Sequence, residues 1–129
     1  MEINKDFKNS IFNSLSLKEP IAEIAEAFLD SNTRNEFLKD LPIIGWASRA
    51  ITAADIIRTN FLINKILKFL EGISGLTQEE INKFEQKHLL KSKNISNFYN
   101  ALLISIDCIN HIDKAKIISS LFRSLIHNK

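Results

Sequence analysis

Three neighbouring residues, Asp107, Cys108 and His111, have side chains that could do chemistry: a carboxylate, a thiol and an imidazole. Asp107 and His111 are four residues apart, the spacing that places two side chains on one face of a helix. A metal site needs three or four ligands, however, and a nucleophilic thiol needs a base held beside it. The helix is predicted to end near Asn110, which puts His111 in a loop. We therefore assign these three residues a structural role.

Known catalytic motifs do not occur elsewhere in the chain. The sequence has no Gly-x-Gly-x-x-Gly, no P-loop, no His-Glu-x-x-His and no Gly-x-Ser-x-Gly. His88 and His127 are isolated on Lys-rich or terminal segments and suggest no partner. We therefore expect no enzymatic activity, no catalytic residues, no cofactor and no metal.

The elements that position these residues are organised around the stretch from Pro42 to Ile73. It is the longest helix-compatible segment and holds the only Trp. One rod of this length would measure about 48 Å, whereas a domain of this size has a radius of gyration of about 14 Å. We predict a core helix that bends or breaks near Arg58–Asn60, or that projects at one end. Its apolar residues form two seams with helical spacing: Ile43, Ala47, Ala50, Ala54, Ile57 and Phe61, then Leu62, Ile66, Phe69 and Ile73.

Three helices are predicted before this central segment. Apolar residues four positions apart predict the first, over Asn4–Leu15. A Ser-x-x-Glu capping box at Ser16–Glu19 opens a second, amphipathic helix that runs to about Asp30. Another capping box opens a short helix over Thr33–Asp40.

The clearest local signal follows the central segment. Thr77 and Glu80 form a capping box, and Leu76 before the cap can pack on Ile81 as a hydrophobic staple. This pattern predicts a helix from Gln78 to about Leu90.

Two further helices complete the chain. Asn94 is expected to cap a buried helix that extends to Ile109, and Asn110 with Asp113 is expected to open an amphipathic helix that reaches the C-terminal end. No segment alternates polar and apolar residues as a strand would. The sequence therefore predicts an all-α, single-domain bundle of five or six helices over residues 1–129.

Composition and charge restrict the setting of the protein. The single cysteine cannot form an internal disulfide, which is typical of a reducing compartment. The N-terminus lacks the features of a secretory signal, and no stretch approaches the roughly 18 apolar residues of a spanning helix. We expect a cytoplasmic protein. The net charge of +2 is too small to indicate a dedicated nucleic-acid binder.

Three groups of residues are candidate interaction sites. Arg49, Asp55 and Arg58 lie on the central segment, where they could orient a partner protein. The alternative is a solvent-exposed stripe on this helix, marked by Ser48, Thr52, Asp55 and Thr59. A stripe of lysines every four residues, either solvated or able to contact phosphates, follows on the next helix: Lys83, Lys87 and Lys91. Trp46 with Ile43 and Ile44 could anchor the protein on a membrane surface, although core packing is the favoured interpretation.

The segment LPIIGWASRAITAADIIRTNFLINKILKFLEGISGLTQEEINKF, with DKAKIISSLFRSLI after it, resembles a family of small uncharacterised bacterial proteins. The shared features are a Pro-Ile-Ile-Gly segment, a charged apolar helix and a Lys-Ala-Lys-Ile-Ile closing helix, over about residues 41–126. The resemblance implies an all-helical fold and a bacterial or phage-related setting, and it implies no activity.

These observations favour a non-enzymatic protein–protein interaction module that forms a homodimer or binds a partner in a host–phage or bacterial defence context. The surplus of apolar helix surface motivates this hypothesis, because the final helix ends uncovered. A peripheral membrane protein is the first alternative, and a weak nucleic-acid binder that uses the lysine stripe is the second.

Overall fold

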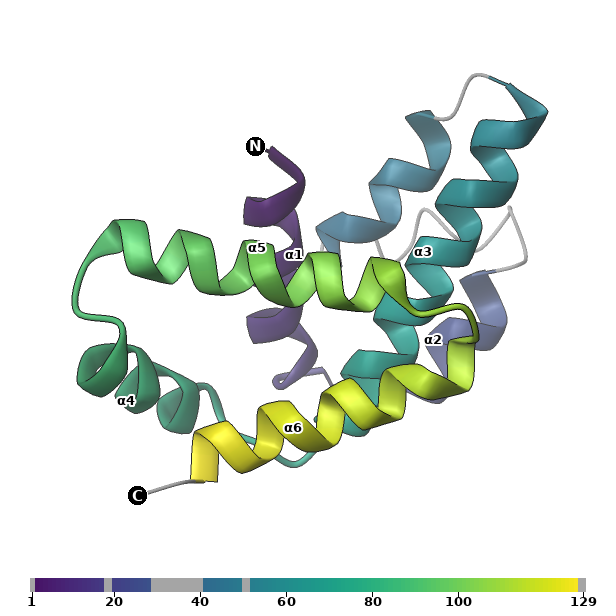
Figure 1. Ribbon diagram of the computed structural model, residues 1–129. Helices are drawn as coiled ribbons and strands as arrows, with labels where there is room; N and C mark the ends of the chain where they lie inside the picture. The colour runs from purple at the N-terminus through teal and green to yellow at the C-terminus, as the bar shows by residue number, and fades with distance from the viewer. Residues whose placement is uncertain (1, 18–19, 29–40, 50–51, 128–129) are drawn as a thin grey trace.

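The computed structural model describes residues 2–17, 20–28, 41–49 and 52–127, and every regular element within these ranges is helical. The prediction of an all-α bundle is confirmed. Two 3₁₀ helices, η2 and η3, accompany six α-helices in the described ranges (Figure 1). In chain order the elements are α1 (Glu2–Ser14), α2 (Ile21–Phe28), η2 (Pro42–Arg49), α3 (Ala53–Gly72), α4 (Gln78–His88), α5 (Ser92–Cys108), η3 (Ile112–Lys114) and α6 (Ala115–His127).

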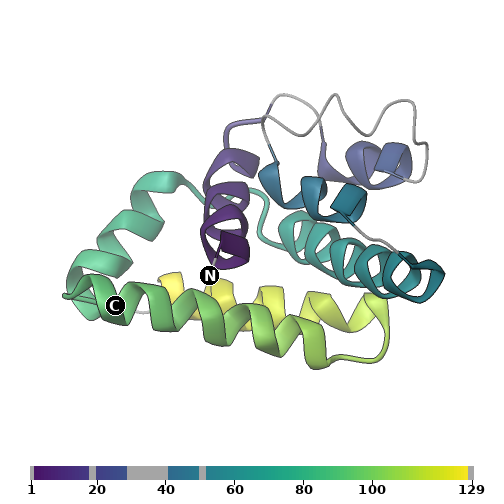
Figure 2. The same cartoon turned by 90° about the horizontal axis from the view of Figure 1, so that it is seen from above.

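The helix α3 is the centre of the bundle, since it packs against α2, η2, α5, η3 and α6. Seen from above, α5 and α6 lie along one side of the molecule, and α1, α2, η2 and α3 lie behind them (Figure 2). The helix α4 joins the two groups at one end (Figure 1). The chain is thus two helical layers around one shared core.

The core between the layers is formed by large apolar side chains, each worth about 1.5–3 kcal/mol when fully buried. Phe69 lies between Phe7 of α1 and Phe122 of α6, with ring centroids 6.2 and 5.6 Å away. Other fully buried members are Ile11, Leu41, Ile43, Ile44, Ile63, Ile66, Leu67, Leu70, Ile73, Ile81 and Ile106.

The central segment differs from the prediction in where it divides. It forms two helices, of which η2 ends at Arg49 and α3 begins at Ala53, whereas α3 is unbroken through Arg58–Asn60. The physical cause is a side-chain cap: Thr52 Oγ1 accepts the Asp55 backbone N–H at 3.0 Å and opens α3 there. The predicted break near Arg58–Asn60 is therefore wrong.

The two predicted apolar seams have different outcomes. Ile66, Phe69 and Ile73 of the second seam are fully buried, as predicted. In the first seam Ile57 is 71% exposed and Phe61 37% exposed, because the first half of α3 extends beyond the layer of α5 and α6 (Figure 2). The alternative that one end of the segment projects is thus the correct one.

The helix α4 begins as predicted. Thr77 Oγ1 accepts the Glu80 N–H at 3.1 Å, and Glu80 Oε1 accepts the Thr77 N–H at 3.0 Å. The staple residues Leu76 and Ile81 are both buried. The helix ends at His88, two residues before the expected end.

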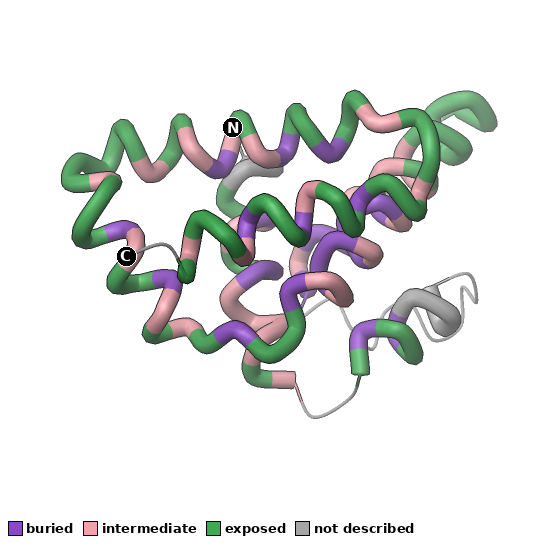
Figure 3. The backbone as a smooth tube through the Cα atoms, turned by 60° about the horizontal axis from the view of Figure 1, so that its bottom comes forward, coloured by how far each residue is buried: buried purple, intermediate pink, exposed green. Residues whose placement is uncertain are grey.

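The helix α5 starts earlier and is less buried than predicted. Its N-cap is Lys91, with no side-chain cap, so the expected cap at Asn94 is wrong. Only Tyr99, Leu103 and Ile106 of this helix are buried. The outward turns of α5 and α6 are exposed along their lengths (Figure 3). The prediction of a buried helix is therefore wrong, because α5 covers the bundle on one face only.

Two predictions lie outside the described residues: the capping box at Ser16–Glu19 and the short helix over Thr33–Asp40. In the described part of the chain, no helix has both the length and the apolar character needed to cross a membrane.

Candidate interaction surfaces

Asp107, Cys108 and His111 lie on the surface where α5 ends and η3 begins. All three are exposed, and His111 Nδ1 accepts the Asp113 backbone N–H at 3.2 Å, which caps the turn η3. The backbone oxygen of Asp107 accepts a hydrogen bond from Lys65. No group of three potential metal ligands occurs among the residues that the structure describes. His111 is thus a helix cap, and Asn110, the predicted cap, instead accepts a hydrogen bond from Lys114 at 2.8 Å.

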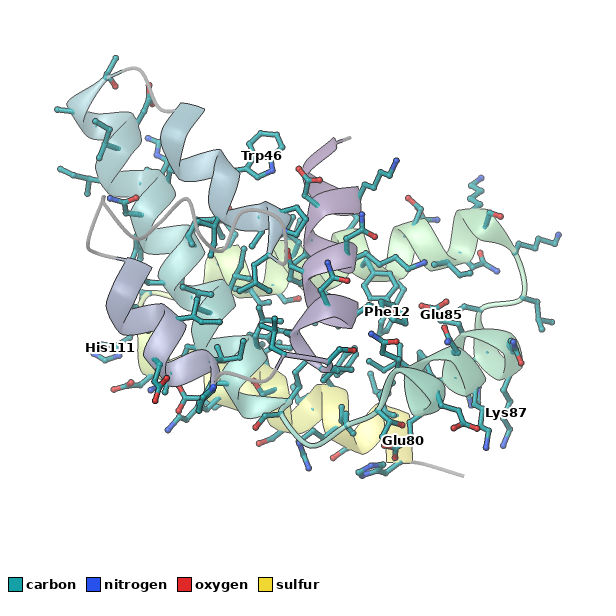
Figure 4. The ribbon with its side chains drawn as sticks, turned by 180° about the vertical axis from the view of Figure 1, so that it is seen from behind. Phe12, Trp46, Glu80, Glu85, Lys87 and His111 are labelled. Atoms are coloured by element: carbon teal, nitrogen blue, oxygen red, sulfur yellow. The ribbon has the colours of Figure 1, made fainter. Side chains whose placement is uncertain are left out.

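Trp46 is partly buried and packs against the core. Its indole N–H donates a hydrogen bond to Asp6 Oδ2 at 3.0 Å, and the ring points toward α1 (Figure 4). Ile43 and Ile44 are fully buried, and the Ile43 N–H donates to the buried Ser10 hydroxyl at 3.1 Å. Core packing is therefore correct for this group, and its two isoleucines are not available to anchor a membrane.

Asp55 and Arg58 are exposed on the projecting half of α3, and no ion pair between them is found within the described side chains. Asp55 lies in the first turn, where a carboxylate interacts favourably with the helix dipole. The Arg49 side chain lies outside the described part. The three predicted residues are thus not shown to form one recognition site.

The lysine stripe is interrupted. Lys83 and Lys87 are exposed on α4, and Lys87 points away from the bundle (Figure 4). Lys91 is not on this helix, because α4 ends at His88 and Lys91 caps α5. Glu79 lies 3.7 Å from the Lys83 ammonium and offsets part of its charge. The predicted three-residue stripe on one helix is therefore wrong.

Lys65 is a buried cation on the central segment, and its partners could not be named from the sequence. It is 2% exposed, and its ammonium donates to the backbone oxygens of Asp107 at 2.7 Å and Ile109 at 3.1 Å. The ring centroid of Phe61 lies 4.4 Å from the same nitrogen. Lys65 thus satisfies carbonyls at the C-terminal end of α5, where a positive charge is favourable.

Glu85 and Tyr99 form a second buried polar cluster. The Tyr99 hydroxyl donates to Glu85 Oε2 at 2.6 Å, and the Lys8 ammonium lies 3.9 Å from Glu85 Oε1. Burial, and secondly the hydrogen bond to Glu85, raise the pKa of Tyr99 well above its usual range. The cluster joins α1, α4 and α5. An open hollow of about 270 Å³ borders it, lined by Asn82, Glu85, Gln86, Leu89, Leu90 and Ile95.

His127 has a partner, contrary to expectation. Its Nε2 lies 2.9 Å from Glu80 Oε2. This contact links the end of α6 to Glu80 at the start of α4 (Figure 4). The backbone N–H of Thr77 is the main cause that lowers the pKa of Glu80.

An exposed apolar surface lies on α5 and α6 and is here called the α5–α6 face. Three aliphatic side chains follow one another every four residues on α6, and they are 60%, 59% and 45% exposed: Ile117, Leu121 and Leu125. Beside them is a hollow of about 170 Å³ between the two helices, lined by Phe98, Ala101, Leu102, Ser105, Ile118, Leu121, Phe122 and Leu125. Ile104 adds another exposed aliphatic side chain on α5.

The sequence contained a signal for the α5–α6 face. The last helix is amphipathic with a wide apolar side, and its apolar residues exceed what one neighbouring helix covers. The residues left exposed could not be named from the sequence, because Phe122 and Ser119 on the same helix are buried.

Comparisons of the chain with protein-family models, with curated proteins and with solved structures found no match.

Proposed function

We propose that the protein is a non-enzymatic protein-binding module, and that its α5–α6 face is covered by another protein chain in the cell. The observation that carries this proposal is the row of Ile117, Leu121 and Leu125, all about half exposed, beside an apolar hollow. Contiguous apolar surface of this kind marks binding sites more often than it occurs without function. Burying such side chains provides the free energy that drives association.

The chemistry of the face supports a protein partner rather than a polyanion. None of the residues that line the hollow is charged. Interface centres are depleted in charged residues, whereas nucleic-acid sites are rich in Lys and Arg. Nucleic-acid binding through Lys83 and Lys87 is the weaker candidate, because Glu79 accompanies them.

The cellular setting rests on the resemblance of residues 41–126 to small bacterial proteins. We place the protein in the cytoplasm of a bacterium or of its phage-infected host. A role in host–phage conflict or defence is the corresponding proposal.

A site-specific crosslinking experiment tests the proposed function. A photo-crosslinking amino acid at position 121, in the full chain expressed in its own organism, is expected to capture protein on illumination. The matched control carries the same amino acid at position 23, which is exposed on α2, and is expected to capture much less. If neither position gives an adduct, the α5–α6 face is not a protein-binding surface.

A membrane role is tested separately by flotation with liposomes. We expect the protein to stay out of the lipid fraction. Flotation that is lost on Leu121→Lys would show that lipid, and not protein, covers the face.

A further inference from the structure

The helix α4 has few apolar contacts with the rest of the protein. Of its 11 residues only Ile81 and Glu85 are buried, and Leu76 just before the helix adds one more buried aliphatic side chain. The second half of α3, by contrast, buries five apolar side chains. Because apolar burial supplies most of the free energy that holds a helix in place, α4 is attached more weakly than α3.

Polar contacts join α4 to its neighbours instead. The Gln78 amide donates to the Phe12 carbonyl at 2.7 Å and to the Ser16 hydroxyl at 2.9 Å. Two carboxylates of α4 lie 2.9 Å from the His127 ring nitrogen of α6 and 2.6 Å from the Tyr99 hydroxyl of α5. Water replaces such partners when a helix moves away, so the net contribution of each contact is modest. These contacts therefore orient α4 without making its opening costly.

The chain can bend on both sides of α4. Gly75, before the helix, has a φ of 97°, a left-handed conformation that glycine adopts without strain. The Arg123 guanidinium donates to the Ser74 carbonyl at 2.8 Å, which ties the chain to α6 up to that residue. After the helix, Leu89 and Leu90 belong to no helix, and Leu90 is 79% exposed. These two short connections are the places about which α4 can turn.

The helix α4 packs on a cluster of aromatic rings. The ring centroid of Phe84 on α4 lies 5.4 Å from that of Phe98 on α5, which in turn lies 5.2 Å from Tyr99 and 6.2 Å from Phe122. Phe98 and Phe122 also line the apolar hollow between α5 and α6. The helix α4 lies at the end of the molecule where α5 begins and α6 ends (Figures 1 and 2). It therefore covers one end of the α5–α6 face.

From this arrangement we infer that α4 is a lid, which opens about its two flanking connections while the rest of the bundle stays folded. Opening separates Phe84 from Phe98, frees the Tyr99 hydroxyl and returns the Glu85 carboxylate to water. The uncovered rings then extend the apolar surface at the α5–α6 hollow. The closed lid limits that surface, and the open lid enlarges it.

Amide hydrogen exchange of the natural chain in increasing urea tests the lid. A local opening needs less free energy and exposes less surface than global unfolding. The amides of residues 82–88 are therefore expected to share one opening free energy that is lower, and less dependent on urea, than that of residues 63–70. Equal free energies with equal urea dependence would mean that α4 opens only with the whole protein, which would overturn the lid.

Two glutamines of α4 give a matched pair of variants. Gln78→Ala removes both hydrogen bonds to the α1 segment and is expected to speed exchange in α4 about three- to tenfold. Gln86→Ala, at an exposed position on the same helix, should change it about twofold or less. If both variants exchanged equally, the polar contacts would not hold the lid closed.

Ile66→Val separates lid opening from global unfolding. Ile66 is fully buried in α3, so this substitution weakens the bundle equally whether α4 is closed or open. Exchange is expected to become faster in α3 and to stay unchanged in α4. The same rise in both helices would contradict a separate opening of α4.

Tyr99, the only tyrosine, reports the surface beneath the lid. It is 1% exposed, so tetranitromethane, which nitrates phenols, should reach it when α4 opens. Its nitration is expected to be faster in Gln78→Ala and unchanged in Ile66→Val. Nitration that followed the α3 amides would show that α4 does not uncover Tyr99. The lid is a property of the single chain, so it can fail while the protein-binding function stands, and the reverse.

Discussion

The Tyr99 hydroxyl and the Glu85 carboxylate are joined by a 2.6 Å hydrogen bond that fixes α5 to α4 inside the protein. Tyr99 is 1% exposed and Glu85 8% exposed, so neither group has full access to water. A hydrogen bond to a charged acceptor in such a place is among the stronger ones in proteins.

Removing the Tyr99 hydroxyl is expected to destabilise the fold. Tyr99→Phe keeps the ring but leaves a buried carboxylate oxygen without its donor, which costs about 1.5–3 kcal/mol in the free energy of unfolding. Urea titration followed by circular dichroism measures the loss. Glu79→Gln, at an exposed position on α4, is the control and should stay within about 0.5 kcal/mol of the natural chain. If Tyr99→Phe left the free energy of unfolding unchanged, a water molecule would have to replace the lost hydroxyl.

The raised pKa of Tyr99 also predicts alkaline sensitivity. The folded chain holds the phenol proton more tightly than the unfolded chain, whose pKa is near 10.0. This contribution to stability is complete below about pH 10 and is lost as the pH rises above it. Because Tyr99 is the only tyrosine, tyrosinate absorbance reports it directly. We expect that absorbance to appear together with unfolding, and titration of a folded chain near pH 10 would contradict the burial argument.

Removing the Lys65 ammonium is expected to lower the free energy of unfolding strongly. Lys65→Met keeps an unbranched side chain that is one atom shorter, and it leaves the Asp107 and Ile109 carbonyls without their donor. Each orphaned group costs about 1–3 kcal/mol. Chemical denaturation measures the total loss in the free energy of unfolding. Faster amide hydrogen exchange at the end of α5 would show that the loss arises there. Lys83→Met, at an exposed lysine on α4, should be nearly neutral.

Gly72 is required by the contact between α3 and α6. A Cβ at this position would collide with Cβ and Oγ of Ser119, whose hydroxyl donates to the Phe69 carbonyl at 2.9 Å. Gly72→Ala is therefore expected to lower the free energy of unfolding by about 1–3 kcal/mol. Adding Ser119→Gly should recover part of the loss, because it removes both colliding atoms. If the double variant lost as much free energy of unfolding as the two single variants together, the two sites would not interact.

The capping box of α4 predicts that the protein loses stability in acid. The folded chain lowers the pKa of Glu80, so the stabilisation is present above the usual value of 4.5 and is lost as the pH falls below it. Glu80→Gln should flatten this part of the stability curve, which urea titrations between about pH 3 and 7 measure. Thr77→Ala removes the other half of the box and should cost about 1 kcal/mol. If both variants kept the acid dependence of the natural chain, another carboxylate would be its cause.

The sequence by itself determined where helices begin, because helix starts depend on residues within about one helical turn of each other. The capping box of Thr77 and Glu80 and the apolar period of α1 are local patterns, and both helices form where these patterns predict. The start of α3 was equally readable, because Thr52 with Asp55 has the spacing of a helix cap. The apolar residues that continue on both sides of Thr52 conceal this signal, because they have the spacing of one uninterrupted helix.

Only the tertiary structure decided which apolar faces are covered. Ile57 and Ile66 both belong to apolar seams on one segment, yet the first is exposed and the second buried, because α5 and α6 pack over one half of α3. Lys65 and Glu85 are buried because partners distant in sequence neutralise their cost: the carbonyls at the end of α5, Lys8 and Tyr99. Burial depends on neighbours brought together by folding. The helices were therefore predictable from the sequence, whereas the exposed α5–α6 face required the packed bundle.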